Sequence, residues 1–147
     1  MFKRILVATD GSPLAKKAVT SAIALAAQNG AELVAVTVVP RYPTNYFDGA
    51  AVFTPEDIGR IEKQWAETAQ AALDTIAKQA EASGVKIKTA TVSADVVGDA
   101  IIAAAKKHDS DTIVMASHGR QGIKRLLLGS ETQHVLTHSD LPVLVLR

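Results

Sequence analysis

The chain has 147 residues, of which 48% are hydrophobic and 21% charged, and this composition predicts one globular domain over residues 1–147 rather than a disordered or fibrous chain. Its 16 basic and 15 acidic residues leave a net charge of +1, which gives no reason to expect nucleic acid or an anionic membrane as the main partner. The absence of cysteine excludes disulfides and thiolate chemistry, and the absence of a signal peptide or of an apolar run near the roughly 20 residues of a membrane helix predicts a cytoplasmic protein.

Two short apolar runs flank a helical pattern at the start of the chain. Residues 5–8 and 33–39 lack polar alternation, so we expect strands that are buried on both faces. Between them, Ser12 and Pro13 are typical of an N-cap and a first helical position, and Gly30 is typical of a helix end. The segment predicts a strand, a helix and a second strand.

Residues 40–55 break this pattern with three prolines, one glycine and four aromatic side chains. A connection of this length is uncommon in a compact domain. It is either a surface loop with its aromatic rings against the body, or a lid or dimer contact.

The next residues return to regular periods. Apolar side chains recur every three or four residues over 58–80, which predicts a long helix that Gly84 ends. Residues 85–92 alternate apolar and polar side chains, so we expect an edge strand with one face in water.

The remaining patterns predict a helix over 97–107, a buried strand over 112–116, a helix over 130–138 and a strand over 142–146. This β-α-β-α-β-α-β-loop-α-β order predicts an α/β fold with an open, parallel, five-stranded sheet and helices on both faces. In such sheets ligands bind beyond the carboxyl ends of the strands.

A glycine-containing loop follows the strand over 112–116. Gly119 and Gly129 would let backbone amides approach an anion, and Ser130 with Gln133 three residues later has the spacing of a capping box. A helix N-terminus favours phosphate, and basic charge between the glycines comes from Arg120, Lys124 and Arg125. The alternative is a glycine loop before a capped helix with no ligand. Neither a P-loop nor a G-x-G-x-x-G fingerprint is present.

These residues carry a family resemblance that extends over essentially the whole chain. Residues 117–119, a nine-residue gap, Gly129, Ser130 and then residues 141–145 resemble the C-terminal signature of the universal stress protein family, and residues 5–12 resemble its first strand and turn. The resemblance implies the adenine nucleotide alpha hydrolase-like fold, with sheet order 3-2-1-4-5.

Members of the family that bind ATP carry the motif G-x2-G-x9-G-[ST]. Gly119, Gly129 and Ser130 match it with the correct spacing, whereas Ala116 stands in place of the first glycine. Alanine tolerates a positive φ poorly, so the replacement is harmless only where φ at this position is negative.

The resemblance implies a site for ATP or another adenine nucleotide. The residues near the adenine and ribose would be Ala8, Thr9, Asp10 and Val38. Met115 and Ala116 would lie under the ribose and phosphates. The residues that hold phosphate oxygens would be Gly119, Gly129, Ser130 and, through its amide, Glu131.

Asp10 is a carboxylate at a strand end, and in a phosphate site it could help to hold Mg²⁺ or Mn²⁺ through oxygen ligands. No activated nucleophile beside a positioned base is recognisable, so we expect at most slow ATP hydrolysis. His134 and His138 share one helix face, where they could hold a metal or serve structure alone. His118 could contact phosphate or lie on the loop surface.

The last strand, Val143–Leu146, has no charged residue before Arg147. At a sheet edge it would be open to pairing with a second copy, and the resemblance implies a two-fold homodimer through it. The sequence therefore favours a stress-associated nucleotide-binding module that acts through conformation or partner choice. The alternatives are a nucleotide-free dimeric interaction protein and a slow ATP hydrolase.

Overall fold

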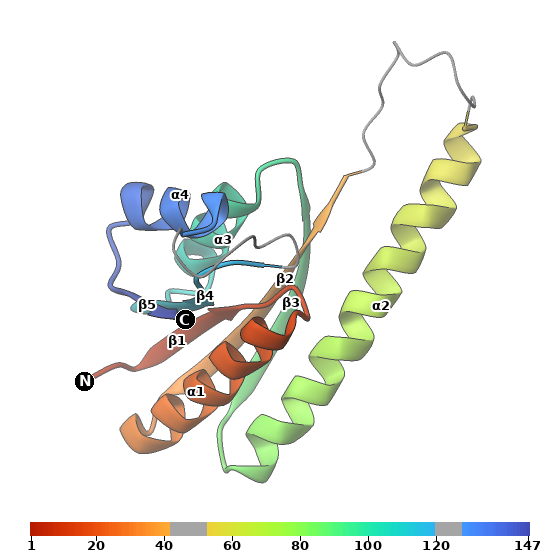
Figure 1. Cartoon of the computed structure of the whole chain (residues 1–147). Coiled ribbons are helices and arrows are strands. Elements are labelled where there is room, and N and C mark those ends of the chain that lie inside the picture. The colour runs from red at the N-terminus through yellow and green to blue at the C-terminus, as the bar shows by residue number, and fades with distance from the viewer. Residues whose placement is uncertain (42–52, 120–127) are drawn as a thin grey trace.

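The structure is a computed structural model that describes residues 1–41, 53–119 and 128–147 (Figure 1). The elements in chain order are β1 (Arg4–Ala8), α1 (Pro13–Asn29), β2 (Glu32–Pro40), α2 (Pro55–Ala82), β3 (Ile87–Ala94), α3 (Val97–Lys107), β4 (Thr112–Ala116), α4 (Ser130–His138) and β5 (Val143–Leu146). This alternation confirms the predicted α/β class.

The strands form one parallel sheet in the order β3-β2-β1-β4-β5, which confirms the predicted topology. β1 lies at the centre, between β2 and β4. β3 and β5 are the two edges. The two strand ends that the sequence singles out, after β1 and after β4, are therefore neighbours.

Helices cover both faces of the sheet. α1 and α2 pack on one face, where their apolar residues join Val7 of β1 and Leu33 of β2, both fully buried. α3 and α4 pack on the other face, over Leu6 and Ile113. Because the central strands are buried on both sides, their side chains are apolar without alternation, as the sequence indicates.

The ends of α1 follow the prediction. The Ser12 hydroxyl accepts the Ala15 amide at 3.2 Å, Pro13 is the first helical residue, and Gly30 adopts a left-handed conformation with φ of 62°. α2 ends at Ala82, and Gly84 follows with a φ of 72°, as the sequence predicts for the end of this helix. β3 begins at Ile87 rather than at residue 85, because the Val85 amide still donates to the Ala80 carbonyl at 2.9 Å.

The capping box predicted for Ser130 and Gln133 is wrong. Gly129 is the N-cap residue of α4, with extended φ and ψ of −62° and 153°, and no side chain caps this helix. Ser130 is already the first helical residue, and the Gln133 amide donates to the Gly129 carbonyl at 3.0 Å. The predicted helix range of residues 130–138 nevertheless coincides with α4.

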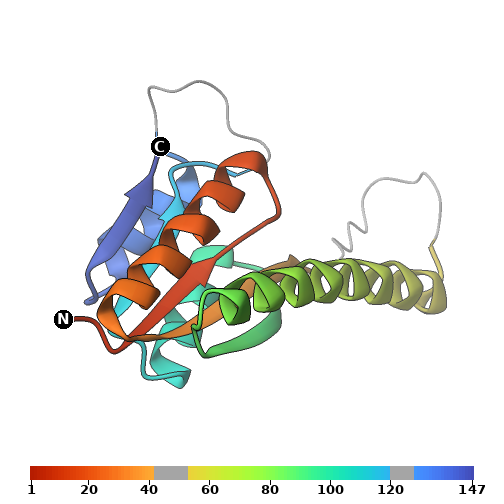
Figure 2. The same ribbon diagram turned by 90° about the horizontal axis from the view of Figure 1, so that it is seen from below.

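α2 begins with a capping box that the sequence analysis did not identify. The Thr54 hydroxyl accepts the Asp57 amide, and the Asp57 carboxylate accepts the Thr54 amide, each at 3.2 Å. The N-terminal half of α2 runs past the edge of the sheet (Figures 1 and 2), and the buried residues of this helix begin at Ala69. The prediction for residues 40–55 falls mainly on 42–52, which lie outside the described residues.

In the described ranges, no helix is both long and apolar enough to cross a membrane.

Candidate functional site at the ends of β1 and β4

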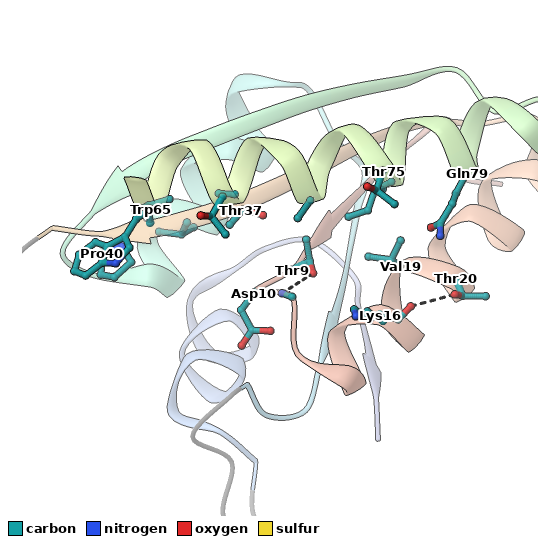
Figure 3. A pocket seen from close by; sticks show the side chains of 17 residues that line it. Thr9, Asp10, Lys16, Val19, Thr20, Thr37, Pro40, Trp65, Thr75 and Gln79 are labelled. Atoms are coloured by element: carbon teal, nitrogen blue, oxygen red, sulfur yellow. Dashed lines mark hydrogen bonds between the residues drawn. The ribbon is translucent and has the colours of Figure 1, made fainter. Parts of the chain in front are cut away.

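The chain leaves the sheet in a tight turn after β1. The Thr9 amide still donates to the Val36 carbonyl of β2 at 3.0 Å, and the next residue, Asp10, has turned away. The Asp10 carboxylate accepts the Ser12 amide at 2.9 Å, while Gly11 supplies a φ of 78°. These bonds set the direction of the Asp10 side chain beyond the carboxyl end of β1, where it points away from α2 (Figure 3).

β2 continues beyond the point where β1 stops. Its pairing with β1 ends at Val36, whereas its pairing with β3 extends to Pro40. Peptide groups alternate in direction along a strand, and the Val36 carbonyl faces β1, so the peptide groups of Val38 face the same side. There they border the space that β1 has left, and they present one donor and one acceptor.

β4 ends under the first turn of α4. The Thr132 hydroxyl, which is buried, donates to the Ala116 carbonyl at 2.8 Å. The Ser117 amide donates to Leu146 of β5, and the Ser117 carbonyl accepts the Gly129 amide, both at 2.7 Å. The Gly129 amide is thus bonded within the protein, whereas the next amides of α4 lie in the first helical turn, where no intrahelical acceptor exists.

Ala116 lies in ordinary strand geometry. Among residues 1–41, 53–119 and 128–147, Asp109 is the only non-glycine residue with positive φ. The replacement of the first motif glycine by Ala116 therefore introduces no backbone strain at the end of β4.

The other two motif glycines lie where a larger residue would collide. A Cβ atom on Gly119 would collide with Oδ2 of Asp10, so the loop after β4 touches the turn after β1. A Cβ atom on Gly129 would lie 3.1 Å from the Ser117 carbonyl oxygen and 3.2 Å from Cα of His118. At Gly129 the absence of a Cβ atom lets two backbone segments approach closely, and at Gly119 it leaves room for the Asp10 carboxylate.

A cavity of about 690 Å³ opens at the carboxyl ends of β1 and β2. It shares Thr9, Asp10 and Val38 with the predicted site and continues between α1 and α2 (Figure 3). Its far wall includes side chains that the sequence analysis did not assign to a site, namely Lys16, Thr20, Trp65, Thr75 and Gln79. Nothing in their spacing distinguishes them from ordinary helix-surface positions.

The predicted residues fall into two groups. Thr9, Asp10 and Val38 line the cavity, while Gly119, Gly129, Ser130 and Glu131 lie toward α4. Asp10 and Gly119 join the two groups by direct contact. Met115 is 5% exposed and belongs to the core under α3 and α4, so its side chain is structural. Arg120, Lys124 and Arg125 lie outside the described residues.

The two histidines of α4 lie side by side, as their spacing predicts, with ring centroids 4.1 Å apart. His134 Nε2 is 2.6 Å from the Asp99 carboxylate of α3, and His138 Nδ1 donates to the His134 carbonyl at 2.9 Å. Within the described part of the chain, no group of three or more His, Cys, Asp or Glu side chains could hold a metal ion. His118 Nδ1 lies 3.1 Å from the Ser117 hydroxyl.

The whole chain, residues 1–147, matches the model of the universal stress protein family. The chain belongs to this family, and its sheet order is the one that the resemblance of its sequence implies.

Individual relatives agree over nearly full length. The chain is 35% identical to universal stress protein MJ0531 of Methanocaldococcus jannaschii over 147 residues, which are 100% of this chain and 83% of that protein. Protein MJ0577 of the same organism has a solved structure with a TM-score of 0.83 at 29% identity, covering 99% of this chain and 96% of that one. A universal stress protein solved in complex with cAMP matches with a TM-score of 0.70 at 26% identity, covering 99% and 97% of the two chains.

Proposed function

We propose that this universal stress protein binds ATP or another adenine nucleotide across the ends of β1 and β4. The observation that carries the proposal is the contact between Asp10 and Gly119, which joins the turn after β1 to the motif loop after β4. A relative has been solved with cAMP, which is also an adenine nucleotide.

The base would lie against Val38. An adenine edge presents a donor and an acceptor side by side, and the Val38 peptide groups on the β1 side offer the complementary pair. The side chains of Thr9 and Val38 line the cavity beside this edge. Asp10, at the turn, is suited to accept hydrogen bonds from ribose hydroxyls.

The phosphates would lie at the start of α4. The amides of Ser130 and Glu131 are in the first helical turn, where no intrahelical acceptor exists, and the helix dipole favours negative charge there. Gly119 and Gly129 keep Cβ atoms out of this space. Ala116 is compatible with the site because its backbone keeps strand geometry.

A divalent cation would come with the phosphates. Mg²⁺ is usually bound through one or two carboxylates together with phosphate oxygens and water. Asp10 is the carboxylate at this strand end, and its oxygens can each accept more than one contact. The cation would neutralise phosphate charge beside Asp10.

We further propose a homodimer through β5 and a cytoplasmic location. Among the strands of the described residues, β5 pairs with β4 alone, and the Pro142 and Leu146 carbonyls face β4, so the peptide groups of Val143 and Val145 face outward. Leu144 is 44% exposed on this edge strand, and Leu136 of α4 is 42% exposed. A second copy would pair the edge and cover these side chains.

The test is mass analysis of small molecules released by denaturing the purified protein, followed by calorimetric titration with ATP and Mg²⁺. We expect adenine nucleotide in the released fraction, or saturable binding, and loss of both in Gly129→Val, whose side chain would press on Ser117 and His118. A wild-type protein that is empty and fails to bind millimolar ATP would support the nucleotide-free dimeric protein instead.

A further inference from the structure

The start of α3 lacks a cap of its own. Its N-cap residue is Val96, which forms no side-chain cap bond, although the first amides of a helix need external acceptors. The acceptor comes from another helix: Oε2 of Glu131 in α4 accepts the Gly98 amide at 2.8 Å. A residue 33 positions away thus does what a Ser, Thr or Asp at position 96 would do locally.

Glu131 is in the first turn of α4, where an acidic side chain usually interacts with the N-terminus of its own helix. Its carboxylate is directed to α3 instead. The negative charge is therefore held at Gly98, and the amides of Ser130 and Glu131 keep their role as donors at the start of α4.

Two further contacts bring the same turns together. A Cβ atom on Gly98 would lie 2.6 Å from Cδ2 of His134, so glycine permits close packing of α3 on α4 (Figure 1). Asp99 accepts from His134 one turn further along α4. On the other side, the buried Thr132 hydroxyl ties α4 to the end of β4.

We propose that Glu131 is a positioning residue for the phosphate-binding end of α4: by capping α3 it holds the first turn of α4 in the orientation that receives phosphate. This inference rests on the proposed nucleotide function. Without the Glu131 contact, the first turn of α4 would spend less time in the orientation that receives phosphate. The apparent affinity for ATP would then fall in proportion to the fraction of molecules in that orientation. A ligand without phosphate does not use this turn, so its affinity is unaffected.

The test compares ATP and adenosine titrations of wild type, Glu131→Ala and Glu131→Gln. We expect Glu131→Ala to weaken ATP binding by about fivefold, as for a fivefold lower competent fraction, and to leave adenosine binding unchanged. Glu131→Gln retains an oxygen acceptor for Gly98 and should bind ATP at least as tightly as wild type. Asp99→Ala, which removes a second polar contact between these helices, should affect neither ligand selectively.

The opposite results are equally clear. If Glu131 acted only by repelling phosphate, both Glu131 variants would bind ATP more tightly than wild type, and the proposal would be overturned. Equal weakening of ATP and adenosine, or the same ATP loss in Asp99→Ala, would also overturn it, because either result indicates general loosening of the fold.

Amide measurements on the unliganded protein separate this inference from the proposed function. Hydrogen exchange at Gly98 should accelerate in Glu131→Ala but not in Glu131→Gln, and ¹⁵N order parameters of residues 130–132 should fall in Glu131→Ala alone. If wild type binds no nucleotide, the proposed function fails. Unchanged exchange and order parameters in Glu131→Ala would mean that Glu131 positions nothing, whatever the protein binds.

Discussion

At the scale of single residues, three glycines lie where an added Cβ atom would have little room. Gly119 faces the Asp10 carboxylate, Gly129 faces the loop backbone, and Gly98 faces the His134 ring. Gly59, in the exposed part of α2, has no atom within 4 Å of an added Cβ and provides a matched control.

Gly119→Ala should weaken ATP binding by about tenfold or more, equivalent to ~1.4 kcal/mol, because the new methyl group displaces the Asp10 carboxylate or the loop. Gly119 is exposed, so the melting temperature should change little. Gly59→Ala should bind ATP as wild type does and gain about 0.5–1 kcal/mol in stability. Calorimetric titration measures the ATP affinity of each variant, and thermal unfolding measures its stability. Equal ATP affinities for the two variants would contradict the role of Gly119.

Gly98→Ala should destabilise the protein by about 1–3 kcal/mol, since the methyl group would overlap the His134 ring and overpack the contact between α3 and α4. His134→Ala in the same chain should recover most of this loss. Urea unfolding of the two single variants and the double variant measures the coupling. No recovery in the double variant would rule out the steric explanation.

At the scale of elements, the N-terminal half of α2 has no buried residue before Ala69 and depends on its own cap. Hydrogen bonds from the Thr54 hydroxyl and, next in size, from the Thr54 amide hold the pKa of the Asp57 carboxyl below its ordinary value. Because folding lowers this pKa, the ionised Asp57 carboxylate stabilises the folded protein at pH values above the ordinary pKa of aspartate. That stabilisation is lost as the pH falls through the lowered pKa.

Thr54→Ala should therefore raise the pKa of Asp57 toward its ordinary value, and the first turn of α2 should fray in the variant at any pH. Carboxyl-carbon NMR titration of wild type and variant measures the shift directly. The Glu32 carboxyl, whose pKa is lowered by Arg4 and Lys86 at the opposite end of the sheet, should titrate identically in both proteins and serves as the internal control. An unchanged Asp57 titration in Thr54→Ala would show that the bonds to Thr54 do not cause the lowered pKa of Asp57.

At the scale of the whole molecule, the arrangement of strands decides which surfaces remain open. β5 is an edge strand with exposed Leu144, and we expect Leu144→Glu to convert the proposed dimer to a monomer by placing charges at a self-complementary interface. Val96→Glu changes a residue that is 47% exposed on another part of the surface and should leave the dimer intact. Light scattering on both variants and wild type gives the masses. A wild-type monomer at micromolar concentration would exclude the dimer.

Sequence patterns predicted the strands and helices, because buried strands and amphipathic helices depend on local residue type, and the family resemblance implied the sheet order that brings the two strand ends together. They predicted the range of α4 correctly but assigned its cap to Ser130, whereas Gly129 is the N-cap residue. They also missed the Glu131–Gly98 bond and the cavity wall at Lys16 and Gln79. These features join residues from separate elements, and no local spacing records which helices will meet.

The most direct test of the account is an ATP titration followed by ¹⁵N amide chemical shifts of the full chain. We expect saturable shifts that cluster at Asp10, Val38, Gly119, Ser130 and Glu131, across the ends of β1, β2 and β4 and the start of α4. Shifts confined to the groove between α1 and α2, at residues such as Lys16 and Gln79, or no shifts at millimolar ATP, would contradict it.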